Sequence, residues 1–300
     1  MTVVEEISRA VADAAARVAP AVVGVGAGGS GVVVAEGLVL TNAHNVRGER
    51  VVVTFADGRR AEADPAGVDL DGDLAVLRVD TATAPALAVA DAPPRMGSTV
   101  LALANPGGRG VRVSTGVVSA LDVSFRGPGG RRLRGAIEHT APLARGSSGG
   151  PVTDLDGRLL GVDTHRAGDG FYLALPAGET LQSRVDALSR GEVPRRPRLG
   201  IAVAHPRLAR RLQRSVGLPE RDGLLVQAVE DDGAAARAGL RQGDLIVRVG
   251  ERDVRSVDDL ADALAAAASG PGPTPSVELH VVRGTEERAV AVDLGEDAAT

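Results

Sequence analysis

The stretch from residue 21 to residue 176 consists of short β-branched segments separated by glycines and other turn formers. Segments of this length and composition predict β-strands. No helix-length pattern lies between them to join parallel strands, so we expect antiparallel sheets, closed or packed, rather than a doubly wound fold. The predicted strands are 21–25, 31–35, 38–41, 51–55, 61–64, 74–79, 99–104, 116–120, 136–139, 159–162 and 171–175.

Helical patterns flank this β-rich stretch. Apolar residues recur at helical spacing over residues 3–18, which predicts an amphipathic helix that ends near Pro20. A second helix is predicted over residues 177–189, and the Pro- and Arg-rich segment Gly191–Arg198 is expected to be a linker. The predicted organisation is a helix at 1–20, a β domain at 21–190, a linker at 191–198 and a second domain at 199–295.

The second domain has a mixed α+β pattern. Its predicted strands are 199–203, 223–229, 244–249, 277–282 and 288–294. One short helix is predicted over residues 234–238 and is ended by Gly239. A longer helix is predicted from Ser256, which forms a capping-box-like pair with Asp259.

The composition excludes several classes of function. A formal net charge of −5 is not expected of a nucleic-acid binder, and the Arg207–Arg214 cluster is interpreted as a solvated loop or helix face. The chain has no cysteine, which excludes disulfides and thiol chemistry. Residues 1–20 contain neither a signal peptide nor a membrane span, so we expect a cytoplasmic protein. Removal of a leader would instead make it periplasmic or extracellular.

The candidate catalytic segment is Gly146-Ser147-Ser148-Gly149-Gly150. Glycine lets the backbone turn tightly, so a serine held between glycines can present its Oγ outward. The amide N–H groups of Gly146 and Ser148 can then converge on one point, where they would stabilise an oxyanion. Because serine is a weak nucleophile at neutral pH, it also needs a base and a group that orients the base.

Two other motifs suggest a cofactor or a metal, but the residues next to each motif do not fit such a site. Gly26–Gly31 matches G-x-G-x-x-G, but a strand follows it where a dinucleotide site requires a helix. Asp69, Asp71 and Asp73 alternate as in a calcium loop, but Leu74 occupies the position that requires glycine. We therefore expect no metal and no organic cofactor.

The serine segment also matches G-x-S-x-G, the nucleophile elbow of α/β-hydrolases. In that fold an acid and a histidine follow the serine, and Asp163 and His165 lie downstream here. An esterase is therefore a rival interpretation. Pro151 and a predicted strand follow the serine, however, where the elbow requires a helix.

The stronger assignment uses residues upstream of the serine. His44 lies where the strand 38–41 ends, and Asp73 begins the strand 74–79. The order His44, Asp73, Ser148 is that of a chymotrypsin-type triad.

These segments resemble the HtrA/Deg family of trypsin-like serine proteases. The C-terminal part resembles the PDZ domain that these proteases carry, through Leu199–Ile201 and Ala236–Ile246. The resemblance implies a mostly β fold, a chymotrypsin-like double β-barrel followed by one α+β PDZ domain. The protease stretches that carry it are Gly29–Val33, Leu40–Val46, Asp73–Leu77, Asn105–Gly107, Thr115–Ala120 and Gly146–Pro151.

The resemblance also implies roles for the candidate residues. His44 would be the general base, Asp73 would orient its ring, and Ser148 would be the nucleophile. Gly146, Ser147 and Ser148 would form the oxyanion hole, with Ser147 contributing backbone only.

This chain departs from the family pattern at the primary specificity pocket. The family favours small aliphatic substrate side chains there, and residues 164–170 would line the pocket. His165 and Arg166 put that preference in question. Arg145 lies next to the oxyanion donors, where it can alter their conformation.

In the second domain, the resemblance places a bound peptide C-terminus at Arg198–Ile201, with the peptide added as a strand along Ile201–Val203. Some of the apolar residues in this region are alternatively ordinary core. The predicted peptide-binding residues are Leu199, Gly200, Ile201, Val203, Ala261 and Leu264.

The function implied by the resemblance is a serine endopeptidase that acts through an acyl-enzyme on unfolded or exposed proteins in protein quality control. The PDZ domain would capture peptide C-termini. The alternative is a latent or inactive protease that serves as a PDZ peptide-binding scaffold. A homo-oligomer is left open, because residues 1–20 lack the aromatics through which relatives trimerise.

Overall fold

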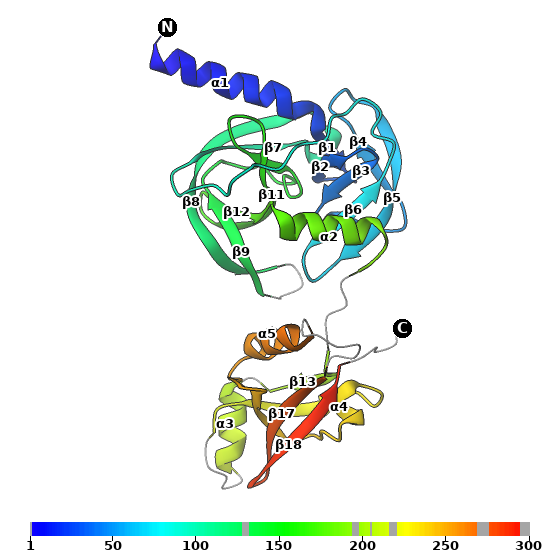
Figure 1. Ribbon diagram of the computed structural model, residues 1–300, viewed down its shortest axis with the longest axis vertical. Helices are drawn as coiled ribbons and strands as arrows, with labels where there is room; N and C mark the ends of the chain where they lie inside the picture. Colours follow the sequence, from blue (N-terminus) through cyan, green and yellow to red (C-terminus); the bar gives the residue numbers. More distant parts are fainter. Residues whose placement is uncertain are drawn as a thin grey trace. The chain divides into compact units, whose positions relative to one another are not determined.

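The computed structural model describes residues 2–127, 132–193, 198–204, 206–215, 221–268 and 276–294. The chain divides into two compact units, Met1–Pro194 and Arg195–Thr300 (Figure 1). Residues 194–197 of the predicted linker lie outside the described residues. Each unit is described by itself.

Six antiparallel strands close into a barrel in the order β1-β2-β3-β6-β5-β4. Valine and leucine side chains fill its interior, as a chain with 1% aromatic residues requires. The strands are β1 (Val22–Val25), β2 (Gly29–Ala35), β3 (Leu38–Thr41), β4 (Val51–Thr54), β5 (Arg60–Asp69) and β6 (Leu74–Arg78).

A second antiparallel barrel closes in the order β10-β11-β12-β9-β8-β7. The two barrels confirm the predicted double-barrel fold class and contain no doubly wound sheet among the described strands. The strands are β7 (Thr99–Ala104), β8 (Arg112–Arg126), β9 (Arg132–His139), β10 (Pro151–Thr153), β11 (Leu159–Gly168) and β12 (Phe171–Pro176).

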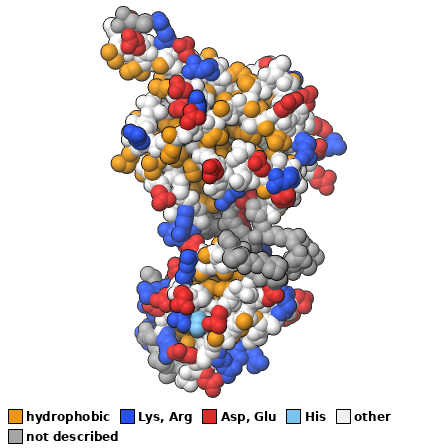
Figure 2. Space-filling model, in the orientation of Figure 1, with side chains coloured by type: hydrophobic (Ala, Val, Ile, Leu, Met, Phe, Trp, Pro, Cys, Tyr) orange, Lys and Arg blue, Asp and Glu red, His pale blue; other side chains and the backbone are white. Residues whose placement is uncertain are grey.

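Two helices accompany the barrels (Figure 1). Helix α1 (Val3–Val18) begins at a capping box between Thr2 and Glu5, and its buried face packs on β7. Figure 2 shows hydrophobic side chains along the rest of α1, where Val4 is 72% exposed. Helix α2 (Glu179–Ser189) covers β5 and β6 and buries three side chains, those of Leu181, Val185 and Leu188. No described helix is both long and apolar enough to cross a membrane.

The second unit contains an antiparallel sheet in the order β13-β14-β15-β17-β18, with β16 paired to β15. Strand β13 (Ile201–Val203) lies at one edge and pairs with β14 alone among the described strands. The remaining strands are β14 (Leu224–Val229), β15 (Leu245–Val249), β16 (Arg252–Asp253), β17 (Ser276–Arg283) and β18 (Glu286–Asp293). The helices are α3 (Pro206–Ser215), α4 (Ala234–Arg237) and α5 (Val257–Ala268).

Candidate active site

His44 and Asp73 form the first pair of the site. His44 lies in a 3₁₀ turn directly after β3, and Asp73 directly precedes β6, the strand that pairs with β3. The His44 Nδ1 atom lies 2.8 Å from Asp73 Oδ1 and 3.0 Å from Oδ2, while the His44 backbone N–H donates to Oδ1 at 3.3 Å. The carboxylate is buried and the imidazole is partly exposed. A carboxylate in this position fixes the tautomer of the ring and leaves Nε2 available as a base.

A threonine that the sequence analysis assigned only to the loop of the specificity pocket completes the surroundings of this carboxylate. The buried Thr164 hydroxyl donates to Asp73 Oδ2 at 2.7 Å. Asn42 donates its side-chain amide to the Asp73 backbone oxygen at 2.9 Å, which holds a residue whose φ of 52° is rare for a non-glycine residue. Thr164 is 91 residues from Asp73 in the chain, so no local pattern indicates the contact.

Ser148 and His44 line the same cleft, which has a volume of about 730 Å³. The structure therefore brings the predicted base and nucleophile to one cavity. In the described part of the chain, the Ser148 hydroxyl donates to the Thr164 carbonyl oxygen at 3.1 Å rather than to the His44 ring.

The turn that carries Ser148 requires glycine at two positions. Gly146 and Gly149 have φ values of 86° and 91°. A Cβ atom on Gly146 would lie 1.9 Å from the backbone oxygen of Gly28. A Cβ atom on Gly149 would lie 2.1 Å from the backbone oxygen of Ser30. The first barrel thus contacts the nucleophile turn so closely that no side chain fits at these positions.

Hydrogen bonds from the first barrel also fix the turn. The Ser30 hydroxyl donates to the Gly146 oxygen at 2.8 Å. The Asn45 side-chain amide and the Ser30 backbone N–H donate to the Ser148 oxygen at 2.8 and 3.0 Å. These bonds tie β2 and the His44 turn to the serine turn of the second barrel.

The three predicted oxyanion residues differ in their hydrogen bonds. The Ser147 N–H donates to the Ala144 oxygen at 3.3 Å, so it is engaged within the turn. The N–H groups of Gly146 and Ser148 have no hydrogen-bond acceptor among the described residues. Two backbone donors next to the Ser148 hydroxyl thus remain available to a substrate oxygen.

Asp163 and His165, the residues that suggested an esterase, contact residues other than Ser148. Asp163 pairs with His139 at 2.8 Å between its Oδ1 and the ring Nε2, and both side chains are buried. His165 stacks on Phe125 with ring centroids 5.8 Å apart. Burial raises the pKa of Asp163, and the hydrogen bond and charge of His139 oppose that rise. The esterase order of serine, acid and histidine is therefore not assembled around Ser148.

The segments that resembled a cofactor motif and a metal motif form turns in the structure. Gly26–Gly31 spans the hairpin between β1 and β2, with no helix N-terminus after it. Asp69 accepts the Gly72 N–H at 2.8 Å, and Asp73 faces His44. Within the described ranges, no group of three His, Cys, Asp or Glu residues could hold a metal ion.

The predicted peptide-binding residues of the second unit fall into two groups. Leu199 and Leu264 are buried in its core, 3% and 5% exposed. Ile201 and Val203 are half-buried on the edge strand β13, and Ala261 is half-buried on α5. Gly200, with φ of 69°, precedes β13, and its oxygen accepts the Glu230 N–H at 2.8 Å.

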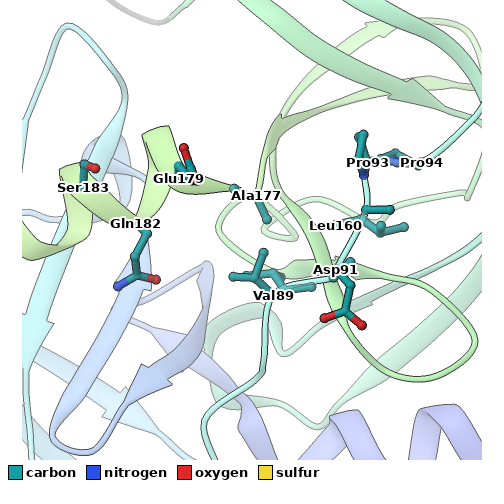
Figure 3. Close-up of a pocket in the computed structure, with 13 residues that line it drawn as sticks. Val89, Asp91, Pro93, Pro94, Leu160, Ala177, Glu179, Gln182 and Ser183 are labelled. Carbon is teal, nitrogen blue, oxygen red and sulfur yellow. The ribbon is translucent and has the colours of Figure 1, made fainter.

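A separate cavity of about 750 Å³ lies beside the start of α2 (Figure 3). Val89, Leu160 and Ala177 line it, and Gln182 reaches it from α2. Asp91, on its rim, is ion-paired with Arg158. None of the proposed catalytic residues lines this cavity.

Comparison with known families identifies the class of both units. The trypsin-like peptidase domain family matches residues 29–162, and the PDZ domain family matches residues 197–294. The fold and these matches define a trypsin-like serine protease domain followed by a PDZ domain.

Individual relatives narrow the class to one family. The chain is 32% identical to a probable periplasmic serine endoprotease DegP-like from Halomonas elongata, over 89% of this chain and 56% of the relative. It is 31% identical to the putative serine protease HhoB from Synechocystis sp., over 90% of this chain and 66% of the relative. The chain spans about half the length of the DegP-like relatives.

Solved structures agree with these relatives. HtrA-type protease AlgW with a decapeptide has a TM-score of 0.73 and 27% identity, covering 94% of this chain and 97% of that chain. AlgW with a tripeptide has a TM-score of 0.67 and 30% identity, covering 94% and 95%. The chain belongs to the HtrA/DegP-like family of trypsin-fold serine proteases with a C-terminal PDZ domain, which confirms the resemblance inferred from its sequence.

Proposed function

We propose that this chain is a serine endopeptidase that cleaves unfolded or exposed polypeptides through an acyl-enzyme. The observation that carries the proposal is the hydrogen-bonded series from Thr164 through Asp73 to His44, which ends in the cleft that Ser148 also lines. Membership of a family of serine endoproteases supports it as well.

In the proposed reaction, the Ser148 hydroxyl turns from the Thr164 oxygen to His44 Nε2, which takes its proton as Oγ attacks the substrate carbonyl carbon. The Asp73 carboxylate stabilises the imidazolium that forms. The N–H groups of Gly146 and Ser148 stabilise the tetrahedral oxyanion. His44 then donates its proton to the leaving amine, and water releases the acyl group by the same route in reverse order.

The second unit is proposed to bind peptide C-termini. Among the described strands, edge strand β13 has one side without a partner strand, which supports addition of a peptide strand there, and Gly200 precedes it as the resemblance requires. The proposed side-chain contacts are Ile201, Val203 and Ala261, with Leu199 and Leu264 supporting them from the core. The proposed domain limits are 21–190 for the protease and 199–295 for the PDZ domain.

A role in protein quality control is part of the proposal, since unfolded chains expose both scissile bonds and C-termini. The names of the DegP-like relatives describe them as periplasmic, which supports a periplasmic location over the cytoplasmic one. The resting Ser148–Thr164 hydrogen bond favours one alternative, a latent protease that acts as a peptide-binding scaffold until activated.

Neighbouring serines provide the test. Ser148→Ala removes the proposed nucleophile and should lower the rate of casein cleavage by about a millionfold, below detection. Ser147→Ala leaves the backbone in place and should retain most of the activity. The rate of casein fragmentation measures both. Activity lost in Ser147→Ala but kept in Ser148→Ala would contradict the assignment, and an inactive wild type with retained peptide binding would favour the scaffold.

A further inference from the structure

A cavity of about 340 Å³ adjoins the nucleophile turn and shares Gly146 and Ser148 with the His44 cleft. Ser148 and Gly146 line it together with Arg145, Asp163, Arg166 and Tyr172. A substrate carbonyl bound by the Gly146 and Ser148 amides would direct the side chain of its own residue, the P1 residue, into this cavity. The charges that line the cavity would then act on the P1 side chain.

Arg166 is held in this cavity by defined contacts. Its Nη2 donates to the Leu143 oxygen at 3.3 Å and to the Tyr172 hydroxyl at 3.2 Å. Its guanidinium carbon lies 5.2 Å from the centroid of the Tyr172 ring. These partners are neutral, and neither Arg166 nor Arg145 forms an ion pair within the described ranges. Both positive charges are thus left without a carboxylate.

The single carboxylate of the cavity does not neutralise them. Asp163 is bonded to His139, and both side chains are buried. The hydrogen bond of Asp163 goes to the imidazole, and Asp163 forms no ion pair with Arg145 or Arg166 within the described ranges. Burial also raises the pKa of Asp163, which disfavours its charged form, while the hydrogen bond and charge of His139 oppose that rise. The cavity consequently keeps the positive charge of its two arginines.

On the basis of the proposed function, we propose that this cavity selects an acidic P1 side chain, with Arg166 as its main specificity-determining residue. A P1 carboxylate would accept hydrogen bonds from the Arg166 guanidinium, which is already oriented by Leu143 and Tyr172. Arg145, at the same turn as the oxyanion donors, adds a second positive charge. This preference differs from the small aliphatic preference that the family resemblance implies.

The test compares quenched fluorescent peptides that are identical except at P1, which is Glu, Gln, Val or Arg. Glu and Gln have the same shape, so their ratio of kcat/KM isolates the charge. Because a charge-assisted hydrogen bond contributes about 1.5–3 kcal/mol, the chain with both of its units should cleave after Glu about ten to a hundred times faster than after Gln. Cleavage sites mapped in casein should show the same preference for acidic P1 residues.

Matched variants assign the preference to Arg166. Arg166→Leu should bring the Glu to Gln ratio of kcat/KM to about one, while Arg166→Lys should keep part of the preference for Glu. The control is Arg95→Leu, which changes an exposed arginine outside the cavity and should leave the ratio unchanged. Labelling of Ser148 by a fluorophosphonate reports whether each variant retains a folded active site.

Three outcomes overturn the inference while leaving the proposed function intact: labelled, active protein that prefers Val, that prefers Arg, or that cleaves after Glu and Gln equally. A preference that survives in labelled Arg166→Leu also overturns it. A wild type that neither labels nor cleaves any substrate contradicts the proposed function itself, and the inference with it.

Discussion

At the scale of single residues, Thr164 connects both ends of the proposed triad. Its side-chain hydroxyl donates to Asp73, and its backbone oxygen accepts the hydrogen bond of the Ser148 hydroxyl. A buried carboxylate that loses one of its donors is less well stabilised and less firmly oriented. Thr164 is therefore a positioning residue for Asp73 and, through it, for His44.

Thr164→Val, which preserves shape but removes the hydroxyl, should lower kcat for peptide cleavage by about tenfold with little change in KM, since one buried hydrogen bond contributes about 1–1.5 kcal/mol. Thr164→Ser restores the donor and should restore most of kcat. Steady-state kinetics on one peptide substrate measure all three proteins. A normal kcat in Thr164→Val, or an equal loss in Thr164→Ser, would remove this role.

At the scale of elements, the sequence predicted most strands of both units within a few residues. Segments that alternate or cluster β-branched residues between glycines, such as β3 and β7, fall where expected. Strand β8 is longer than predicted, because its residues after Ala120 are largely exposed and carry no core pattern. Strand β10 was missed, since it has three residues and begins with a proline. Helix α3 was not predicted as a helix, because its arginines were interpreted as a solvated loop or helix face, although Leu208, Ala209 and Leu212 recur at helical spacing.

In the candidate site, too, a local sequence pattern indicates some residues, and only the folded structure brings the others together. His44, Asp73 and the serine turn each lie in a local segment whose composition indicates its role, so the sequence could single them out. Thr164 and the His139–Asp163 pair act through contacts that join strands distant in the chain. Such contacts depend on barrel closure, which no short pattern specifies. The interpretation of Asp163 as an esterase acid arose because its true partner was not visible in sequence.

At the scale of the whole molecule, the chain is two units with separate cores, so a defect in one should remain local. In the second unit, Arg283 binds the buried Asp244 with two hydrogen bonds of 2.7 and 2.8 Å, and the Arg241 N–H adds a third at 2.9 Å. Burial raises the pKa of Asp244. The hydrogen bonds and charge of Arg283 and the hydrogen bond from the Arg241 N–H outweigh this effect, so the pKa lies below its usual range.

Asp244→Asn should therefore lower the free energy of unfolding of the second unit by about 1–3 kcal/mol at pH 7, with the first unit unchanged. Because the folded pKa is depressed, this stabilisation is fully present above the unfolded value of about 3.9 and is lost as the pH falls through the folded pKa. Wild type and variant should thus converge in acid. Hydrogen exchange resolved by unit measures both effects, and a difference that stays constant down to low pH would contradict the ion-pair explanation.

The proposed reaction requires His44 to activate the hydroxyl of Ser148. The most direct measurement is the position and rate of the adduct formed by diisopropyl fluorophosphate, mapped by peptide mass spectrometry in the presence of unfolded casein. We predict a single phosphoryl group on Ser148 in the wild type and in Ser147→Ala, with labelling abolished in His44→Ala. An adduct on Ser147, or labelling of Ser148 that is as fast without His44, would contradict it.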